Sequence, residues 1–422
     1  MKRMFLCFIF CIFVIAACNT KDEPTIQMYV KVIDGQGKAL ENATVVMGNQ
    51  AGEMASFLST DAAGEAYFDA APSNATVTAA FSCDSPYSDS TYHYVDIASG
   101  VNVSAVTLTL GTCDQSVQQV NINVTDQVAG ITSSEVTLGP ITYSGPTATM
   151  YIYELQDDGN ISVFASGFDD AGNIKGYGFA LDQPAVDGSL IEVSIDRTDL
   201  MQNTHFFGNA PSNTVSYYAV AALLRKHSST NLSFNFISGT APVPASMTTY
   251  STAGFADNNM FAAAVSIDQD GDGNADADIG LTRYLKNVSD QYFDFSPAPL
   301  VPGNLTFSPG EAGRPIIYWS NNDSSSTMQK LTLRYSSTSP ERIFFYYITV
   351  PATAGGIVFP ELPVTLAAFR PGAYSNLALE TVKFEGSTSY DDYLKAIDNN
   401  NGRFYEEAAL SSYHYTRISR VP

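Results

Sequence analysis

Short runs of alternating apolar and polar residues fill most of this chain, and Gly, Pro, Asn and Asp residues separate them. Every second residue from Ile26 to Val32 is apolar, and the turn-forming residues 34–37 follow. Alternation with a period of two is typical of half-buried β-strands, whereas the amphipathic period of a helix is almost absent. The sequence therefore predicts an all-β fold of tandem β-sandwiches, Ig-like or transthyretin-like in type.

Composition limits the function classes. Apolar residues make up 45% of the chain and aromatic residues 12%, which is enough for packed cores and excludes a disordered chain. The formal net charge is −22, so the surface repels nucleic acid and anionic lipid headgroups. We therefore expect no nucleic-acid partner.

The length of 422 residues allows several domains. After a leader at 1–17 and a tether at 18–25, we expect three units, which cover residues 26–115, 116–296 and 297–422. The residues Pro297-Ala298-Pro299 are typical of a linker. Whether 116–296 forms one large sandwich or two small ones stays open at this stage.

Two local patterns depart from plain alternation. Residues 390–398 place Tyr390, Tyr393, Leu394 and Ile397 on one helical face, which predicts a short helix in the last unit. Residues 219–226 are compatible with a helix by composition, although the preceding tyrosines favour a strand. The single tryptophan, Trp319, is expected to anchor a core.

The N-terminus has the pattern of an export signal. Lys2 and Arg3 precede a wholly apolar run from Phe5 to Ala17, and this run is too short to span a bilayer as a stable helix. Its ending, Ile15-Ala16-Ala17-Cys18, resembles the lipobox of bacterial lipoproteins. The resemblance implies cleavage before Cys18, a diacylglycerol on its thiol, and attachment to a membrane through lipid. An ordinary secretory signal is the alternative.

The residues after Cys18 bear on location. Asn19 is not Asp, which in lipoproteins of Gram-negative bacteria implies the outer membrane, and 21–23 resemble a short charged surface-export signal or a plain solvated tether. Cys7 and Cys11 would leave with the leader, and Cys18 would carry lipid. Cys83 and Cys113 are then expected to form a disulfide in an oxidising compartment, with two free buried thiols as the alternative.

The first unit has a further resemblance. The pattern Val30-x-Val32-x-Asp34-x-x-Gly37-x-x-Leu40-x-x-Ala43-x-Val45, followed by Thr60-Asp61-x-x-Gly64-x-Ala66-x-Phe68, resembles the carboxypeptidase regulatory-like domain. The resemblance covers about 26–80, or up to 113 with the disulfide. It implies a small transthyretin-like or Ig-like sandwich with an accessory role and no catalytic residue.

An acidic stretch at 268–278 is the best candidate for a metal site. Asp residues at loop positions 1, 3 and 5, with Gly273 at position 6, resemble the calcium loop of EF-hand and dockerin modules. Position 12 is Ile279 rather than a carboxylate, and no helical pattern flanks the loop. We expect a structural calcium ion in a hairpin loop, and the alternative is an acidic turn without an ion. The expected ligands are Asp268, Asp270, Asp272, Asn274, Asp276 and Asp278.

Enzyme signatures are weak. His93, His205, His227 and His414 lack metal-binding spacing, and no nucleophile elbow or phosphate loop occurs. A glycosidase needs two carboxylates at a set separation in space, which adjacent acidic pairs do not establish. Clustered tyrosines fit a sugar-stacking face, but they fit sandwich cores better.

The leading hypothesis is a lipid-anchored cell-envelope protein of the outer membrane with a non-enzymatic binding or structural role. Its partner would be a glycan or an envelope protein, and no catalytic residue is assigned. One rival is a surface hydrolase that acts on polysaccharide through an unrecognised carboxylate pair. Another is an assembly subunit of an envelope or appendage machine. A cleft with two facing carboxylates would favour the hydrolase.

Overall fold

The structure is a computed structural model of the 422-residue chain. It describes residues 26–35, 37–84, 90–111, 118–138, 141–152, 160–199, 201–224, 232–251, 258–286, 290–310, 314–320, 323, 325–338, 341–371, 374–386 and 388–420. The leader, the tether and Cys18 lie outside these residues, and so do Cys113 and His227. Strands dominate the described chain, which confirms the predicted all-β fold of packed sandwiches.

A long mixed sheet is the largest sheet of the described structure. Its twelve described strands run in the order β17-β16-β19-β20-β28-β27-β24-β25-β6-β5-β2-β3. Their bounds, in chain order, are β2 (Thr44–Gly48), β3 (Met54–Ser59), β5 (Ala75–Asp84), β6 (Thr91–Val101), β16 (Thr214–Leu224), β17 (Leu232–Thr240), β19 (Asn258–Ile267), β20 (Ala277–Leu285), β24 (Met328–Thr338), β25 (Glu341–Pro351), β27 (Asn376–Phe384) and β28 (Ser412–Arg420).

This sheet contains strands from all three expected units. β6 of the first unit pairs in parallel with β25 of the last, and β20 of the middle unit pairs with β28. The residues 219–226 that also fitted a helix lie largely in strand β16. Backbone hydrogen bonds of one sheet join segments on either side of the boundaries expected near 115 and 296. That the three units fold independently therefore stays a prediction.

One face of the long sheet carries a layer that closes the first core. This layer contains β1 (Ile26–Ile33), β4 (Glu65–Ala71) and β7 (Ala105–Thr109), in the order β4-β1-β7, and α2 (Tyr390–Asn399) lies beside β7. Val30, Val45 and Val77 are fully buried here, together with Leu394 of α2. The alternating residues of β1 therefore bury one side against β2 and β5, as the pattern predicts.

The opposite face carries two smaller sheets that close a second core. Their orders are β18-β15-β21 and β22-β23-β26. Trp319 on β23 is 4% exposed, and its Nε1 donates to Oε1 of the fully buried Gln329 at 2.8 Å, which confirms the expected core anchor. The bounds are β15 (Met201–Gly208), β18 (Ser246–Ser251), β21 (Gln291–Asp294), β22 (Gly303–Ser308), β23 (Ile316–Ser320) and β26 (Gly356–Val358), with the 3-10 helix η2 at Val364–Phe369.

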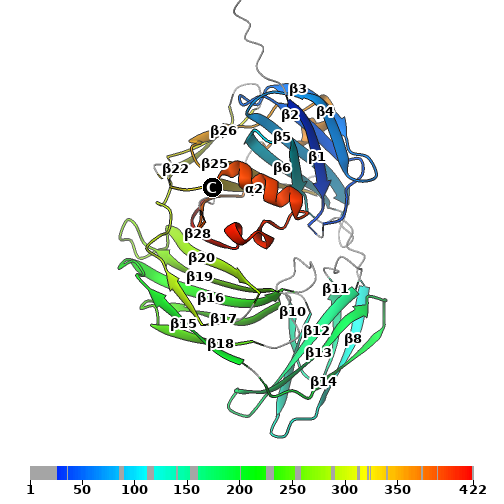
Figure 1. Ribbon diagram of the computed structural model, residues 1–422, viewed down its shortest axis with the longest axis vertical. Helices are drawn as coiled ribbons and strands as arrows, with labels where there is room; N and C mark the ends of the chain where they lie inside the picture. Colours follow the sequence, from blue (N-terminus) through cyan, green and yellow to red (C-terminus); the bar gives the residue numbers. More distant parts are fainter. Residues whose placement is uncertain are drawn as a thin grey trace, which may run out of the picture.

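Residues 118–195 form a sandwich with its own core. Sheet β10-β9-β12-β13 packs on sheet β11-β8-β14, and Figure 1 shows this lobe (cyan to green) apart from strands β1 to β6. Ile122, Val163 and Ile195 are central to that core. The bounds are β8 (Gln118–Asp126), β9 (Ser133–Leu138), β10 (Ile141–Ser144), β11 (Thr147–Ile152), β12 (Asn160–Phe168), β13 (Ile174–Pro184) and β14 (Leu190–Ile195).

Helix α2 confirms the helix expected at 390–398. It begins with a capping box, in which the Ser389 hydroxyl accepts from the backbone N–H of Asp392 and the Asp392 carboxylate accepts from that of Ser389. Tyr390, Tyr393 and Leu394 are buried on one face. The chain then continues through the short 3-10 helices η3 (Phe404–Glu406) and η4 (Ala408–Leu410) into β28.

Candidate metal centre and ligand-binding groove

The acidic loop connects β19 and β20 as a hairpin, as the missing flanking helical pattern indicated. Asp268, Asp270 and Asp276 each bring a carboxylate oxygen into one group whose atoms lie within 4.8 Å of one another. All three are hard oxygen donors, which is the ligand type that Ca²⁺ prefers. The geometry of this group is therefore compatible with a cation, and calcium stays a prediction.

Backbone N–H groups hold the loop in this shape. The Asp268 carboxylate accepts from Gly271 at 2.6 Å and from Gly273 at 2.8 Å, while that of Asp276 accepts from Gln269 and Asp270. Gly271 and Gly273 have φ values of +83° and +90°, a region that side chains with a Cβ rarely adopt. The two glycines therefore let the loop fold over its own carboxylates.

Two other predicted ligands, Asp272 and Asp278, lie outside that group of carboxylates. The Asp272 carboxylate accepts from the side chain and backbone of Asn274, and these hydrogen bonds lower the pKa of Asp272. Asp278 belongs to β20, where its carboxylate accepts from the Ser266 hydroxyl at 2.7 Å and its backbone pairs with Arg417 of β28. The structure thus brings three of the five predicted carboxylate ligands together, and the strand register gives Asp278 a different set of neighbours.

Partly buried charges lie on the α2 side of the long sheet. Lys330 of β24 pairs in register with Glu380 of β27, and its ammonium lies over the rings of Tyr393 and Phe404 at 5.6 and 5.1 Å from their centroids. Burial lowers the pKa of Lys330, against the effect of Glu380 and Asp96. Burial likewise raises the pKa of Asp96 to about 7, although its Oδ2 accepts from the Thr109 backbone at 2.8 Å.

A second ionic cluster lies on the opposite face. The Glu385 carboxylate accepts from Nη2 of Arg283 at 2.8 Å and lies 3.4 Å from Nε2 of His414. Burial lowers the pKa of His414, and the Glu385 charge opposes this shift. His414 is only 3% exposed, so the cluster is placed to hold β20 and β28 together rather than to meet a substrate. Sequence reasoning missed it because its members are far apart in the chain.

The adjacent acidic pairs have local structural roles. The Asp169 carboxylate accepts from the backbone of Ala171 and Asn173 and so closes a hairpin turn, and Asp392 caps α2. Glu406 belongs to η3, and Glu407 follows it. Of these residues, Asp169 and Asp392 thus stabilise their own turn and helix end.

The tyrosine clusters are mainly interior. Tyr346 is fully buried and donates to the Phe369 carbonyl at 3.0 Å, and the hydroxyls of Tyr218 and Tyr415 lie 2.9 Å apart. Tyr347, on the other side of its strand, is 39% exposed. Packing therefore explains most of these residues.

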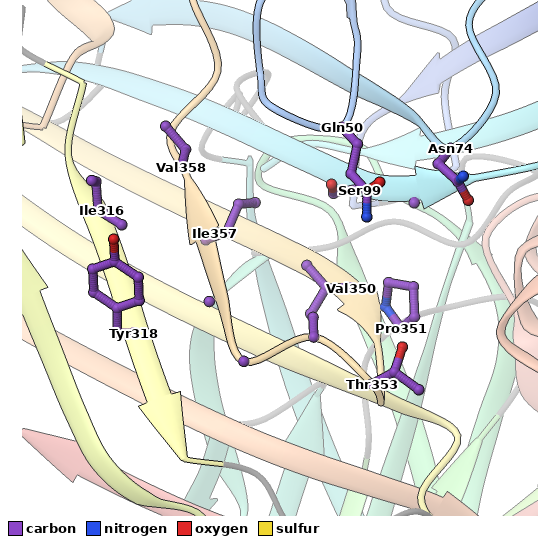
Figure 2. Close-up of a pocket in the computed structure, with 14 residues that line it drawn as sticks. Gln50, Asn74, Ser99, Ile316, Tyr318, Val350, Pro351, Thr353, Ile357 and Val358 are labelled. Atoms are coloured by element: carbon purple, nitrogen blue, oxygen red, sulfur yellow. The ribbon is translucent and has the colours of Figure 1, made fainter. Parts of the chain in front are cut away.

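A groove lies where the first unit meets the sheet β22-β23-β26, and we call it the seam groove. Its volume is about 450 Å³. Gln50, Asn74 and Ser99 line it from the first unit, and Tyr318 and Thr353 from the last, as Figure 2 shows. A second hollow of about 430 Å³, lined by residues 49–51, 73 and 74, shares Gln50 and Asn74 with the first. Sequence analysis missed this groove, since no motif marks its residues.

Cys83 is disulfide-bonded at the end of β5. Cys113 lies outside the described residues, so its pairing with Cys83 stays a prediction. Within the described chain, no helix combines the length and apolarity needed to cross a membrane.

No model of a known protein family matches the chain, so the resemblance of 26–80 to the carboxypeptidase regulatory-like domain also stays a prediction. No curated protein matches it either. Among solved structures it is similar to the Bacillus anthracis TIE protein (8% identity, TM-score 0.17, 64% of this chain and 49% of that one). It is also similar to a DUF4876 family protein from Bacteroides thetaiotaomicron (11% identity, TM-score 0.14, 64% of this chain and 45% of that one). A third similar structure is a putative adhesin from Bacteroides ovatus (6% identity, TM-score 0.13, 72% of this chain and 96% of that one). The chain spans about half the length of the first two.

Proposed function

We propose that this protein is a lipid-anchored component of the outer membrane with a non-enzymatic binding or structural role. The observation that carries the proposal is the continuous sheet from β17 to β3, which joins strands of all three expected units into one framework. Such a framework holds loops and grooves at fixed positions, as a display or binding protein requires. The lipobox-like ending at Cys18 supports anchoring by lipid.

The test combines location with activity. We expect the protein in the outer-membrane fraction of cells, with metabolic lipid labelling that Cys18→Ser abolishes. We also expect purified protein to capture a glycan or envelope protein without releasing products from a broad glycan panel. Product release that an Asp→Asn change in 116–296 abolishes would replace this proposal with the hydrolase.

We further propose that the acidic loop binds calcium as a structural ion. The support is the group formed by Asp268, Asp270 and Asp276, whose oxygens converge in an exposed hairpin loop. Calcium at millimolar concentration should then raise the melting temperature of the chain, because a ligand that binds only the folded state stabilises it. The double variant Asp268→Asn and Asp270→Asn should lose this response, while Asp69→Asn, an exposed control on β4, should keep it. An unchanged melting temperature with calcium would rule the ion out.

A further inference from the structure

The two hollows at the seam adjoin each other and have uncharged linings. They meet at Gln50 and Asn74, so the groove extends from Tyr318 past these amides to residue 49. None of its described lining residues is Asp, Glu, Lys, Arg or His, in a chain of net charge −22. Three charged side chains beside the groove are engaged with other groups of the protein. Arg314 donates to the carbonyls of Ala51 and Phe359. Glu361 accepts from the Met54 backbone, and Glu53 accepts from the Asn49 side chain. A charged ligand would therefore find no counter-charge on these walls.

Amides and hydroxyls face the groove. Asn102 donates to Oδ1 of Asn74 at 2.8 Å and accepts from its backbone N–H, which leaves Nδ2 of Asn74 as a donor toward the groove. Within the described part of the chain, the Gln50 side chain has no hydrogen-bond partner, and the exposed Thr353 hydroxyl lies across the groove (Figure 2). These groups both donate and accept, which suits a ligand rich in hydroxyls.

An aromatic ring supplies the apolar side of the groove. Tyr318 is 50% exposed, and its backbone pairs with Gly356 of β26. A Cβ at Gly356 would lie 2.9 Å from Cδ1 of Tyr318, so the glycine gives the ring room beside β26. The ring thus keeps an exposed surface against which an apolar ligand face can pack.

The walls are held in place before any ligand arrives. The Arg314 bond to Ala51 measures 2.7 Å, and the Glu361 backbone donates to the Gly52 carbonyl at 2.7 Å, so the loop from the first unit is fixed to the last unit. The parallel pairing of β6 with β25 supports the base of the groove, where Ser99 and Val350 lie. Preorganised walls reduce the entropy that binding costs.

We propose that the seam groove binds an uncharged, hydroxyl-rich chain, namely a neutral oligosaccharide, with one sugar ring against Tyr318 and its hydroxyls on Gln50, Asn74 and Thr353. Two adjoining hollows suit a chain of several sugar units, and the volume of the first falls in the range of ligand sites, roughly 300–1,000 Å³. This proposal rests on the non-enzymatic binding role proposed above and gives that role a ligand class.

The experiment is isothermal titration of the full chain with linear neutral oligosaccharides of glucose, mannose and xylose, and with an oligogalacturonate as the anionic probe. We expect binding of at least one neutral probe and none of the anionic one. Tyr318→Ala should weaken binding roughly tenfold or more, or about 1.4 kcal/mol, and Gln50→Ala should weaken it less. Tyr143→Ala, a 44% exposed tyrosine of the separate sandwich, is the matched control and should bind as the parent does.

Three results would overturn the proposal: no binding of any neutral probe, preference for the anionic probe, or binding that Tyr318→Ala and Gln50→Ala leave unchanged. Melting temperatures of both variants show whether a loss of binding reflects unfolding, and Gln50, on an exposed loop, is the safer of the two. Hydrolysis of the bound sugar would refute the non-enzymatic role and leave the groove assigned. Capture of an envelope protein without sugar binding would refute the groove alone.

Discussion

The surroundings of the Asp96 carboxyl predict how the stability of the protein depends on pH, in both sign and size. Asp96 lies on β6 in register with Tyr347, and its charge contributes, after burial, to the raised pKa of Tyr393 on α2. Burial raises the pKa of Asp96 to about 7, while backbone hydrogen bonds and the Lys330 ammonium oppose the shift. The low-dielectric surroundings therefore outweigh its hydrogen bonds and the nearby positive charge.

The folded chain then binds the Asp96 proton more tightly than the unfolded chain does. A carboxyl with a raised folded-state pKa contributes stability that is fully present below its unfolded pKa of about 4. This contribution is lost as the pH rises through about 7. Three pKa units correspond to about 4 kcal/mol at most, since each unit is worth about 1.4 kcal/mol.

Asp96→Asn removes the cost of ionising this carboxyl in the folded protein at high pH. The side chain keeps its shape, and its amide oxygen can still accept from the Thr109 backbone. Part of the gain is offset because Lys330 loses a nearby negative charge. We expect the free energy of unfolding of the variant to exceed that of the parent by about 2–3 kcal/mol at pH 8–9 and to equal it near pH 4. Thermal unfolding of both proteins from pH 4 to 9 measures the difference, and the exposed control Asp69→Asn should show no such trend. A difference that is flat with pH, or greatest in acid, would refute the reasoning.

Three further predictions concern stability. Trp319→Phe should cost about 2–4 kcal/mol, because it leaves the buried Gln329 carbonyl without its donor and removes part of a core ring; chemical denaturation measures the loss. Ile122→Ala should cost about 2–5 kcal/mol and should raise hydrogen exchange in 118–195 while sparing the long sheet, and equal changes in both would show that the two cores unfold together. Reduction should lower the melting temperature, and non-reducing mass spectrometry should recover a peptide pair that contains Cys83 and Cys113; recovery of a free Cys113 thiol would reject the pairing.

Local patterns in the sequence predicted local structure well. Alternation located β1, β12, β24 and β27, because each of these strands buries one face or both. The helix face at 390–398 and the hairpin character of the acidic loop were likewise predictable. Asp278 follows the loop in strand β20, where strand register decides its neighbours, so its role as a ligand stays a prediction.

The pairing between distant segments could not be predicted from the sequence. The β6–β25 pairing joins strands whose own patterns carry no mark of a partner, so three apparently separate sandwiches gave no sign of a shared sheet. The seam groove depends on that pairing, because Gln50 and Tyr318 meet only when the first and last units dock. Its residues are also individually unremarkable, and only their convergence makes a site.

The β6–β25 pairing also orders events during folding. Thr91 pairs with Arg342, so the chain as far as residue 342 of 422 must be present before this part of the sheet can close. Closing so long a loop makes the step slow, and until then β6 presents an open strand edge on which other chains could pair. We therefore expect folding of this protein to depend on chaperones that shield strand edges, and chains truncated before β25 to aggregate.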